Sequence, residues 1–557
     1  MKDVLIIGSG GAGLSAALSA KASGASVLVV GKAYPTNSQT SMAQGGMNAA
    51  LANVEEDHIS THITDTIKAA HGLCDEDMVR KMCADAPDTI AWLEHIGVPF
   101  SRLTSEANKR YEDNNVLQDN DTLSSELNTK NPQQSSIHTI AQRQMGGASA
   151  KRACYAQDYT GLKILHTLYD TCLKENINFL EEYYLLNLVT LDGVAKGATF
   201  LDIRTGEIKQ IHAKSVIIAT GGYASLYHGY TTNAYGSTGD GIAAVLRAGG
   251  AVSDMEFIQF HPTALKHSSI LISESARGEG GYLINSDNER FVDELKPRDE
   301  VARAIFEQLQ KGKEVFLDLR HLGEKTLMEL LPQEVALCKL HEHIDPAIEL
   351  IPIKPVAHYS MGGIEVDTAL EVKGIKGCFA VGECSNAKVH GANRLGGNSL
   401  LEITAFGKFV GENAYKYAIY ASNKKIEERQ LQQDKKEIEA IYTKENLINF
   451  YEKRLDLGKL FYEKVGILRD NAQLTQAMEE VIAMQVMQKK IGITDKSQKN
   501  NTNLIEYLEF SNALLLAPTI ISAALARNES RGAHYKIGFE SQDDEKFKQH
   551  IVLQWKD

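Results

Sequence analysis

A glycine-rich turn near the N-terminus constrains the fold of this chain most. The apolar run 2–7 has the length of a strand, the motif Gly-Ser-Gly-Gly-Ala-Gly follows at 8–13, and a small-residue helix and a second strand are expected at 14–23 and 26–30. GxGxxG between a strand and a helix, inside one βαβ unit, predicts a dinucleotide site, with a purely structural glycine turn as the alternative. Gly8 permits the tight turn, Gly10 lets the backbone approach a pyrophosphate, and Gly13 allows the helix to pack closely on the strand. The helix N-terminus would offer unpaired N–H groups to the phosphates.

Composition bounds the kind of protein. A chain of 557 residues is expected to form roughly two to four domains. Its 43% hydrophobic and 24% charged residues are typical of a soluble globular protein, and a net charge of −13 argues against a nucleic-acid partner. A small anionic substrate is not excluded, because local charge can oppose global charge. We expect no membrane span and no secretory signal, since long apolar runs and a basic leader are missing.

The cysteines are scattered and odd in number. No CxxC pair occurs, so we expect reduced cytosolic thiols, no disulfide scaffold, and no zinc or iron–sulfur site in this chain. The seven are Cys74, Cys83, Cys154, Cys172, Cys338, Cys378 and Cys384.

The residues that follow the second strand leave the cofactor undecided. An acid that would hold an adenosine ribose is missing there, where Gly31 and Lys32 stand, so NAD and FAD both remain open. The next segment, 34–46, is polar and ends in two glycines, which suits loop backbone lying against a cofactor.

Three separate strands that end in glycine indicate one sheet. Besides the first, they are 215–218, which runs into Gly221 and Gly222, and 377–381, which runs into Gly382 and Glu383. They predict a doubly wound α/β sheet interrupted by an inserted domain of roughly a hundred residues. Residues 55–98 are expected to be helical, with Asp57, Asp65 and Asp75 near possible helix starts. Residues 103–142 are expected to form a polar surface insertion, and those from 423 a charged helical bundle.

Four segments concentrate polar groups in apolar surroundings. They lie at 259–263, 273–281, 297–299, and 358–363 together with 390–402. Each has a structural explanation: His261 could be a turn histidine, Glu274 and Arg277 a helical ion pair, and Arg298 part of a helix N-terminus. Together they supply several cationic or donor groups, which suits a ligand with two carboxylates.

These segments and the glycine turn resemble a known family. The chain is similar, over nearly all its length, to the flavoprotein subunit of succinate dehydrogenase and fumarate reductase, in a superfamily that also includes L-aspartate oxidase. The motifs that carry the resemblance are GSGGAG (8–13), AQGG (43–46), ATGGY (219–223), STGDG (237–241), FHPTA (260–264), ESARGEGG (274–281), RDEVAR (298–303), HYSMGGI (358–364), VGE (381–383), HGANRLGGNSLLE (390–402) and ESRGAHY (529–535).

The resemblance implies FAD, a fold and a reaction. The expected fold is a Rossmann-like FAD-binding domain (1–236 and 353–420), an inserted α+β capping domain (237–352) and a C-terminal helical domain (421–557). The expected reaction interconverts fumarate and succinate by hydride transfer at flavin N5. Electrons would be exchanged with a quinone pool through an iron–sulfur subunit and a membrane-anchored quinone-reactive subunit, on the cytoplasmic face of the inner membrane.

The resemblance also implies roles for individual residues. His261, Ser273, His358 and Arg394 would clamp the two carboxylates. Arg298 would transfer the proton, resupplied through Glu274 and Arg277; because arginine is by itself a poor acid, this role rests on the resemblance. The residues expected at the cofactor are Gly8, Gly10, Gly11, Ala12, Gly13, Lys32, Ser38, Thr40, Gln44, Gly45, Gly46, Asp240, Glu383, Ser399 and Leu400.

Two residues depart from the pattern of the family. Many members carry a histidine that bonds covalently to the flavin, but Gln39 stands at that place, so we expect non-covalent FAD and a bias towards fumarate reduction or another substrate. Met145 stands where L-aspartate oxidases commonly have a glutamate suited to an ammonium group, which favours a plain dicarboxylate. L-Aspartate oxidase remains the alternative function, and a flavin-binding electron-transfer or regulatory module without turnover is a third.

Overall fold

A seven-stranded sheet carries the glycine turn. The computed structural model describes residues 1–103, 137–422 and 428–555. The strand order is β6-β2-β1-β9-β8-β7, with β16 also paired to β9; β6, β2, β1, β9 and β16 run parallel, and β7 and β8 add an antiparallel edge. The strands are β1 (Lys2–Ile7), β2 (Val27–Val30), β6 (Asn178–Leu180), β7 (Tyr183–Leu191), β8 (Val194–Asp202), β9 (Ile208–Ile218) and β16 (Cys378–Ala380). The predicted α/β architecture, with a parallel sheet next to the glycine turn, is confirmed.

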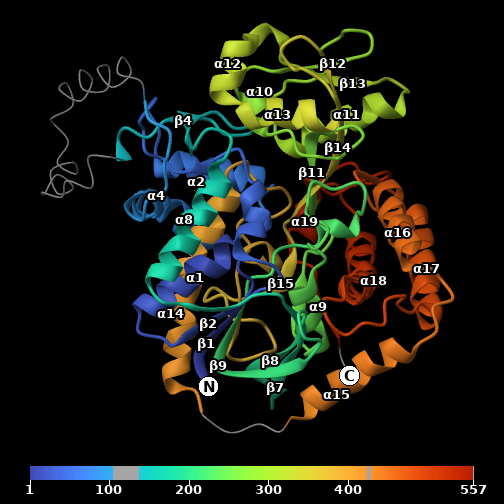
Figure 1. Cartoon of the computed structure of the whole chain (residues 1–557). Coiled ribbons are helices and arrows are strands. Elements are labelled where there is room, and N and C mark those ends of the chain that lie inside the picture. The colour runs from blue at the N-terminus through green and yellow to red at the C-terminus, as the bar shows by residue number, and fades with distance from the viewer. Residues whose placement is uncertain (104–136, 423–427, 556–557) are drawn as a thin grey trace, which may run out of the picture.

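Helix α1 (Gly11–Ala22) fits closely between its neighbours because its side chains are small. It packs on α14 (Asn398–Tyr420), and both lie with α8 (Thr160–Lys174) on one side of the sheet (Figure 1). A Cβ added at Gly407 or Gly411 of α14 would lie 2.6 Å from the Ser15 Cβ or 2.4 Å from the Ala16 carbonyl oxygen. Helices α1 and α14 can therefore pack this closely only because Gly407 and Gly411 have no side chain.

A second sheet with its own hydrophobic core forms the cap, which we define as residues 258–360. Its strand order is β11-β14-β13-β12, and Leu283, Val301, Leu317 and Ile351 are fully buried in its core. Figure 1 shows the cap at the top of the molecule, with β11 at the edge that faces the rest of the chain. Its elements are β11 (Ile258–Leu265), α10 (Glu274–Gly278), β12 (Tyr282–Asn285), α11 (Arg298–Gln310), β13 (Val315–Asp318), α12 (Gly323–Leu330), α13 (Pro332–His341) and β14 (Ile351–Ser360). The domain boundaries given above stay a prediction.

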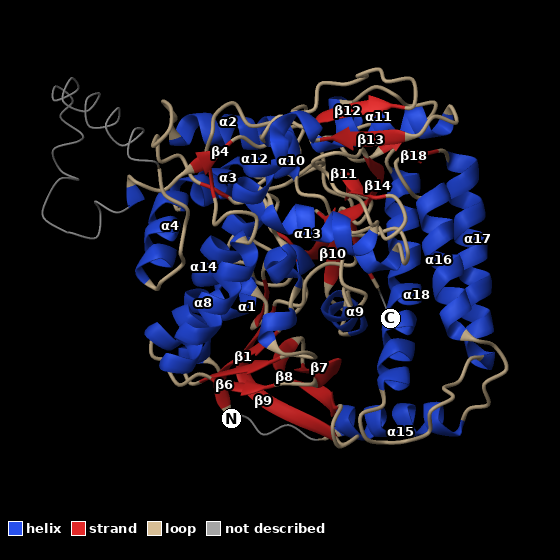
Figure 2. Cartoon of the chain, turned by 45° about the horizontal axis from the view of Figure 1, so that its top comes forward, coloured by secondary structure: helices blue, strands red, loops and turns tan. Residues whose placement is uncertain are grey.

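The C-terminal region is mainly helical. It contains α15 (Arg429–Thr443), α16 (Phe450–Lys464), α17 (Asn471–Met487) and α18 (Thr502–Ala526), and Figure 2 shows the last three side by side along one flank. By length and apolar composition α18 could cross a membrane, but 67% of its most apolar stretch is buried inside the molecule, as in the core helix of a globular protein.

Short elements complete the described chain. They are β3 (Met47–Asn48), α2 (Ile59–Ala69), α3 (Glu76–Ala84), α4 (Ala86–His95), β4 (Gln142–Arg143), β5 (Ala153–Cys154), α9 (Asp240–Arg247), β10 (Ala251–Ser253), β15 (Gly363–Glu365), β17 (Ser385–Asn386), β18 (Leu468–Arg469), β19 (Tyr535–Lys536), α19 (Asp544–Phe547) and β20 (Val552–Gln554).

Of the three aspartates expected near helix starts in the N-terminal helical region, Asp57 and Asp75 lie at such starts and Asp65 does not. Asp75 caps α3 by accepting from the N–H groups of Asp77 and Met78. Asp65, by contrast, lies inside α2, and its Oδ2 is 2.6 Å from Arg152 Nη1. Asp57 lies just before α2, near its start as expected, and its Oδ1 is 3.0 Å from Nη2 of the same buried guanidinium, which requires anionic partners. Most of the polar insertion, 104–136, and residues 423–427 lie outside the described residues.

Candidate active site

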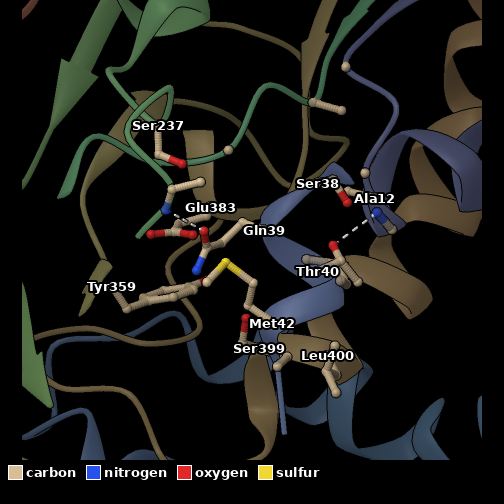
Figure 3. Close-up of a pocket in the computed structure, with 18 of the residues that line it drawn as sticks. Ala12, Ser38, Gln39, Thr40, Met42, Ser237, Tyr359, Glu383, Ser399 and Leu400 are labelled. Atoms are coloured by element: carbon tan, nitrogen blue, oxygen red, sulfur yellow. Dashed lines mark hydrogen bonds between the residues drawn. The ribbon is translucent and has the colours of Figure 1, made fainter. Parts of the chain in front are cut away.

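A cavity of about 400 Å³ runs from the glycine turn to the cap. It brings together every residue predicted for the cofactor except Gly13, and all of the predicted substrate and proton-transfer residues except Arg277. Figure 3 shows Ala12, Ser38, Gln39, Ser399 and Leu400 around it. Sequence reasoning gave no role to several of its lining residues: Thr220, Ser237 and Tyr359 lie within the quoted motifs, whereas Tyr183, Leu271 and Ile403 lie outside them and have no local pattern that sets them apart.

The glycine turn is shaped by backbone contacts that exclude a side chain. Gly8 has φ +114°, and a Cβ there would lie 2.1 Å from the Ala219 carbonyl oxygen. A Cβ at Gly13 would lie 2.0 Å from the Gly8 carbonyl oxygen. Gly13 therefore allows the helix to pack against the turn and does not line the cavity. The Gly11 N–H at the start of α1 donates to Thr40 Oγ1 at 3.1 Å (Figure 3). The turn is therefore tightly fixed where a pyrophosphate would approach.

Polar atoms without partners line the cofactor end of the cavity. Ser38 Oγ, Gln44 Oε1 and Thr220 Oγ1 are buried and make no hydrogen bond within the described parts of the chain. Buried polar groups are normally paired, so these atoms indicate a polar ligand at this place. Together with the glycine cradle, they fit a dinucleotide.

Lys32 is held by two carboxylates from distant elements. Its Nζ lies 2.6 Å from Asp240 Oδ2, at the start of α9, and 2.8 Å from Glu509 Oε1 on α18. Burial disfavours the ammonium form, but the two carboxylates outweigh burial and hold the pKa of Lys32 above its ordinary value. Asp240 Oδ1 also accepts hydrogen bonds from Tyr184, Thr238 and Asn512. Lys32 and Asp240 thus form a structural pair at the cavity wall, and sequence reasoning missed Glu509.

Gln39 lies in the loop beside the cavity and is held by a backbone contact. Its Oε1 accepts from the Ala234 N–H at 2.9 Å (Figure 3). The side chain is therefore ordered, and its amide cannot form the bond to flavin that a histidine forms.

Arg298 is the centre of the charged cluster. It is the first residue of α11, and its Nε and Nη2 donate to Glu274 Oε2 at 2.9 and 2.5 Å. The other carboxylate oxygen of Glu274 accepts from the Gly146 N–H at 3.0 Å and lies 3.5 Å from Arg277 Nη2. Burial raises the pKa of Glu274, but Arg298 and Arg277 outweigh burial, so its pKa stays below the ordinary value and it is ionised. Arg277, Glu274 and Arg298 therefore form a continuous series of side-chain contacts.

Gln259 joins Arg298 to Arg394. Its Oε1 accepts from Arg298 Nη1 at 3.0 Å and from Arg394 Nη2 at 3.1 Å, and its Nε2 donates to the Arg394 carbonyl at 2.8 Å. The Arg394 guanidinium lies 4.4 Å from the centre of the Tyr359 ring, and its Nε is buried without a partner in the described chain. Burial, and then the charge of Arg298, lower the pKa of Arg394 to about 10. Sequence reasoning noted the segment of Gln259 but not this bridge.

Two histidines face each other from the paired strands β11 and β14. The ring centres of His261 and His358 are 4.9 Å apart. His261 Nδ1 lies 3.0 Å from the Thr263 carbonyl oxygen and 3.3 Å from the Thr263 backbone nitrogen, and His358 Nδ1 lies 2.7 Å from Thr232 Oγ1. Burial and the charge of Arg298 hold the pKa of both histidines well below the ordinary value. Both effects favour the neutral form of the two rings.

Ser273 and Met145 complete the cap side of the cavity. Ser273 precedes α10, accepts from the Ser275 N–H at 3.1 Å, and donates its own N–H to Glu334 Oε1 at 3.0 Å. Met145 lines the cavity and carries no charge. The cavity thus combines a dinucleotide cradle with cations and neutral imidazoles suited to a small dianion.

The chain is similar to known proteins over nearly all its length. Residues 3–400 match the FAD binding domain family, and residues 454–557 match the fumarate reductase flavoprotein C-terminal family. The chain is 37% identical to the 8-methylmenaquinol:fumarate reductase flavoprotein subunit of Wolinella succinogenes, covering 99% of this chain and 88% of that protein. It is also 37% identical to the succinate dehydrogenase flavoprotein subunit of Coxiella burnetii, covering 99% and 94%.

Solved structures show the same similarity. A quinol–fumarate reductase with menaquinol molecules aligns with a TM-score of 0.89 at 34% identity, covering 99% of this chain and 95% of that chain. The Sdh1 complex of Mycobacterium smegmatis with UQ1 aligns with a TM-score of 0.83 at 30% identity, covering 99% and 91%.

Proposed function

This chain belongs to the family of fumarate reductase and succinate dehydrogenase flavoprotein subunits, FAD-dependent oxidoreductases, and from that premise we propose that it interconverts fumarate and succinate. One observation carries the proposal: Arg298, Arg394 and the two facing histidines share a single cavity with the dinucleotide cradle. A dicarboxylate bound by these groups would lie next to the cofactor, as the reaction requires.

The proposed work of the protein is to hold the substrate and move a proton. Bound FAD supplies the hydride chemistry of the reaction. Arg394, His261, His358 and Ser273 hold the two carboxylates, and burial excludes water that would weaken these contacts. A dianion would favour the imidazolium form of the histidines, so binding is expected to draw a proton to at least one ring.

Arg298 is proposed to exchange the proton with the substrate carbon. It lies against Glu274, which contacts Arg277 on its far side, so a proton can be returned along this chain. Arginine normally remains protonated, so this role requires that the proton be returned through Glu274 and Arg277. Burial lowers the pKa of Arg277 and of Arg394, and the charge of Arg298 lowers both further.

FAD is proposed to be bound without a covalent link. Gln39 stands where many family members have the linking histidine, and a glutamine amide cannot form that bond. The glycine turn and the polar atoms around it would then retain the cofactor. Met145 supports a plain dicarboxylate over L-aspartate, since an ammonium group would find no carboxylate at that position.

The chain is proposed to work within a membrane-associated complex. The Wolinella relative is a menaquinol-linked fumarate reductase subunit, and the aligned structures contain menaquinol or UQ1. An iron–sulfur subunit and a membrane-anchored quinone-reactive subunit are the proposed partners, as the family resemblance implies. The proposed location is the cytoplasmic face of the inner membrane.

Fumarate-dependent oxidation of a reduced viologen tests the proposal. The FAD-loaded chain is expected to oxidise the dye anaerobically only when fumarate is added, because the viologen replaces the electron-donating partners. Absence of fumarate-dependent oxidation by a protein that retains its flavin would refute the proposed activity.

A further inference from the structure

We propose that Glu334, on cap helix α13, is a positioning residue that connects the substrate-binding segment of the cap to Asp158 in the FAD-binding part of the chain. The inference deepens the proposed function and rests on it. Neither residue lines the cavity, so any effect on catalysis must pass through the residues that they hold.

The side chain of Glu334 holds the segment that begins α10. It is 1% exposed, and its Oε1 accepts the Ser273 N–H at 3.0 Å. The following residue, Glu274, is the carboxylate that contacts Arg298. One buried carboxyl group therefore fixes the backbone that carries both a predicted substrate ligand and the predicted proton relay.

The backbone of Glu334 connects the same helix to the cofactor side. Asp158, which is fully buried, accepts the N–H groups of Gln333 and Glu334 with its Oδ2, at 2.7 and 3.2 Å. Two residues later, Thr160 Oγ1 donates to the Gln44 carbonyl at 3.3 Å, and Gln44 lines the cavity. A continuous series of contacts thus runs from the cofactor loop, through Asp158 and Glu334, to Ser273.

Several buried polar atoms around the side chains of Glu334 and Asp158 lack hydrogen-bond partners among the described residues. Glu334 Oε2 and Asp158 Oδ1 are buried and make no hydrogen bond to any described residue, and the same holds for Nε and Nη1 of nearby Arg143. Arg143 lies over the Tyr155 ring, 3.7 Å from its centre, and its Nη1 is 3.9 Å from Glu279. Because Arg143 is one cation near the two buried acids Asp158 and Glu334, a neutral form is favoured for one of the two acids.

Burial, and then Asp158, raise the pKa of Glu334 to about 8, so it is protonated at neutral pH. The other charged or titratable groups facing the pair are Arg143, Tyr159 and Cys338. Deprotonation would place two carboxylates at this contact with only Arg143 to balance them. The contact between α13 and Asp158 should therefore weaken as pH rises.

The sign of the pH effect follows from linkage. Separating the two sides exposes Glu334 and returns its pKa from about 8 towards the ordinary 4.5. The assembled form therefore binds a proton more tightly than the separated form. The free energy that favours the assembled form decreases as pH rises from about 5 to about 8, and it does not decrease further above that pH. The KM for fumarate should rise across this range by at most about tenfold per pH unit.

Variants at Glu334 test the proposal in the FAD-loaded chain with reduced viologen as electron donor. Glu334→Leu removes the acceptor of the Ser273 N–H and should raise the KM for fumarate by about tenfold. Glu334→Gln keeps an acceptor oxygen but cannot ionise, so it should retain the low KM and lose the increase in KM with pH. Glu324→Gln, an exposed glutamate on α12, is the matched control and should behave like the wild type.

The ratio of the KM of the wild type to that of Glu334→Gln at each pH removes effects common to both proteins, including the protons consumed by the reaction. An unchanged ratio from pH about 6 to about 8 would overturn the inference, even if Glu334→Leu failed to fold. Wild-type protein that holds FAD but does not reduce fumarate would instead refute the proposed function, and the inference with it.

Discussion

At the scale of single residues, Gln259 sets the spacing of the two arginines proposed to contact substrate. It lies within β11, and one side-chain oxygen accepts from both Arg298 and Arg394. Because the two guanidiniums repel each other, a shared neutral acceptor is an effective way to hold them at one site. The arginines come from segments far apart in the chain, so no local pattern could have predicted this contact.

Arg298→Ala should abolish most turnover without releasing FAD. The variant removes the proposed proton donor, and general acid catalysis typically contributes about 10²–10⁴-fold to the rate. Fumarate-dependent viologen oxidation measures the loss, and flavin absorbance after gel filtration measures retained FAD. Arg320→Ala, an exposed arginine of the cap that pairs with Asp318, should keep wild-type activity. Turnover within about twofold of wild type in Arg298→Ala would remove Arg298 from this role.

Gln39 predicts that the flavin dissociates from denatured protein. After precipitation with acid, the yellow cofactor should be found in the supernatant, because no covalent bond at residue 39 holds it to the polypeptide. The spectrum of the washed, redissolved pellet provides the measurement. Flavin remaining in that pellet would contradict the non-covalent assignment.

At the scale of elements, the glycine turn and α1 behave as one unit with β1. Gly13→Ala should lower both FAD content and melting temperature, since its Cβ would meet the Gly8 carbonyl at 2.0 Å and push the helix away from the turn. Gly193→Asn, in the β7–β8 hairpin, is the control: Gly193 has φ +73° and open space around it, and asparagine tolerates this conformation. Full FAD occupancy and unchanged melting in Gly13→Ala would show that close packing there is dispensable.

Elements whose signals are local were predicted well. The first strand, glycine turn and helix are as expected, and the helix predicted after 297 is α11. Contacts between distant elements could not be predicted in this way. The pairing of Lys32 with Glu509 needs α18 beside the sheet, and the pairing of Asp65 inside α2 with Arg152 depends on the burial of that arginine, which is not apparent in the sequence.

At the scale of the whole molecule, the site is divided between two structural parts. The cap supplies His261, Ser273, Glu274 and Arg298, whereas Arg394 comes from the segment that leads into α14. The polar segments alone predicted an anionic ligand, but only the resemblance identified the substrate. Their convergence on one cavity depends on how the cap sits on the FAD-binding part, which local sequence patterns do not determine.

Reduction of the bound flavin by succinate, compared with L-aspartate, tests the proposed substrate most directly. Under anaerobic conditions, succinate should bleach the flavin absorbance and added fumarate should restore it, because both dicarboxylates fit the same cationic cavity. L-Aspartate should leave the spectrum unchanged, since Met145 offers no carboxylate for its ammonium group. Bleaching by L-aspartate but not by succinate would contradict the proposed function.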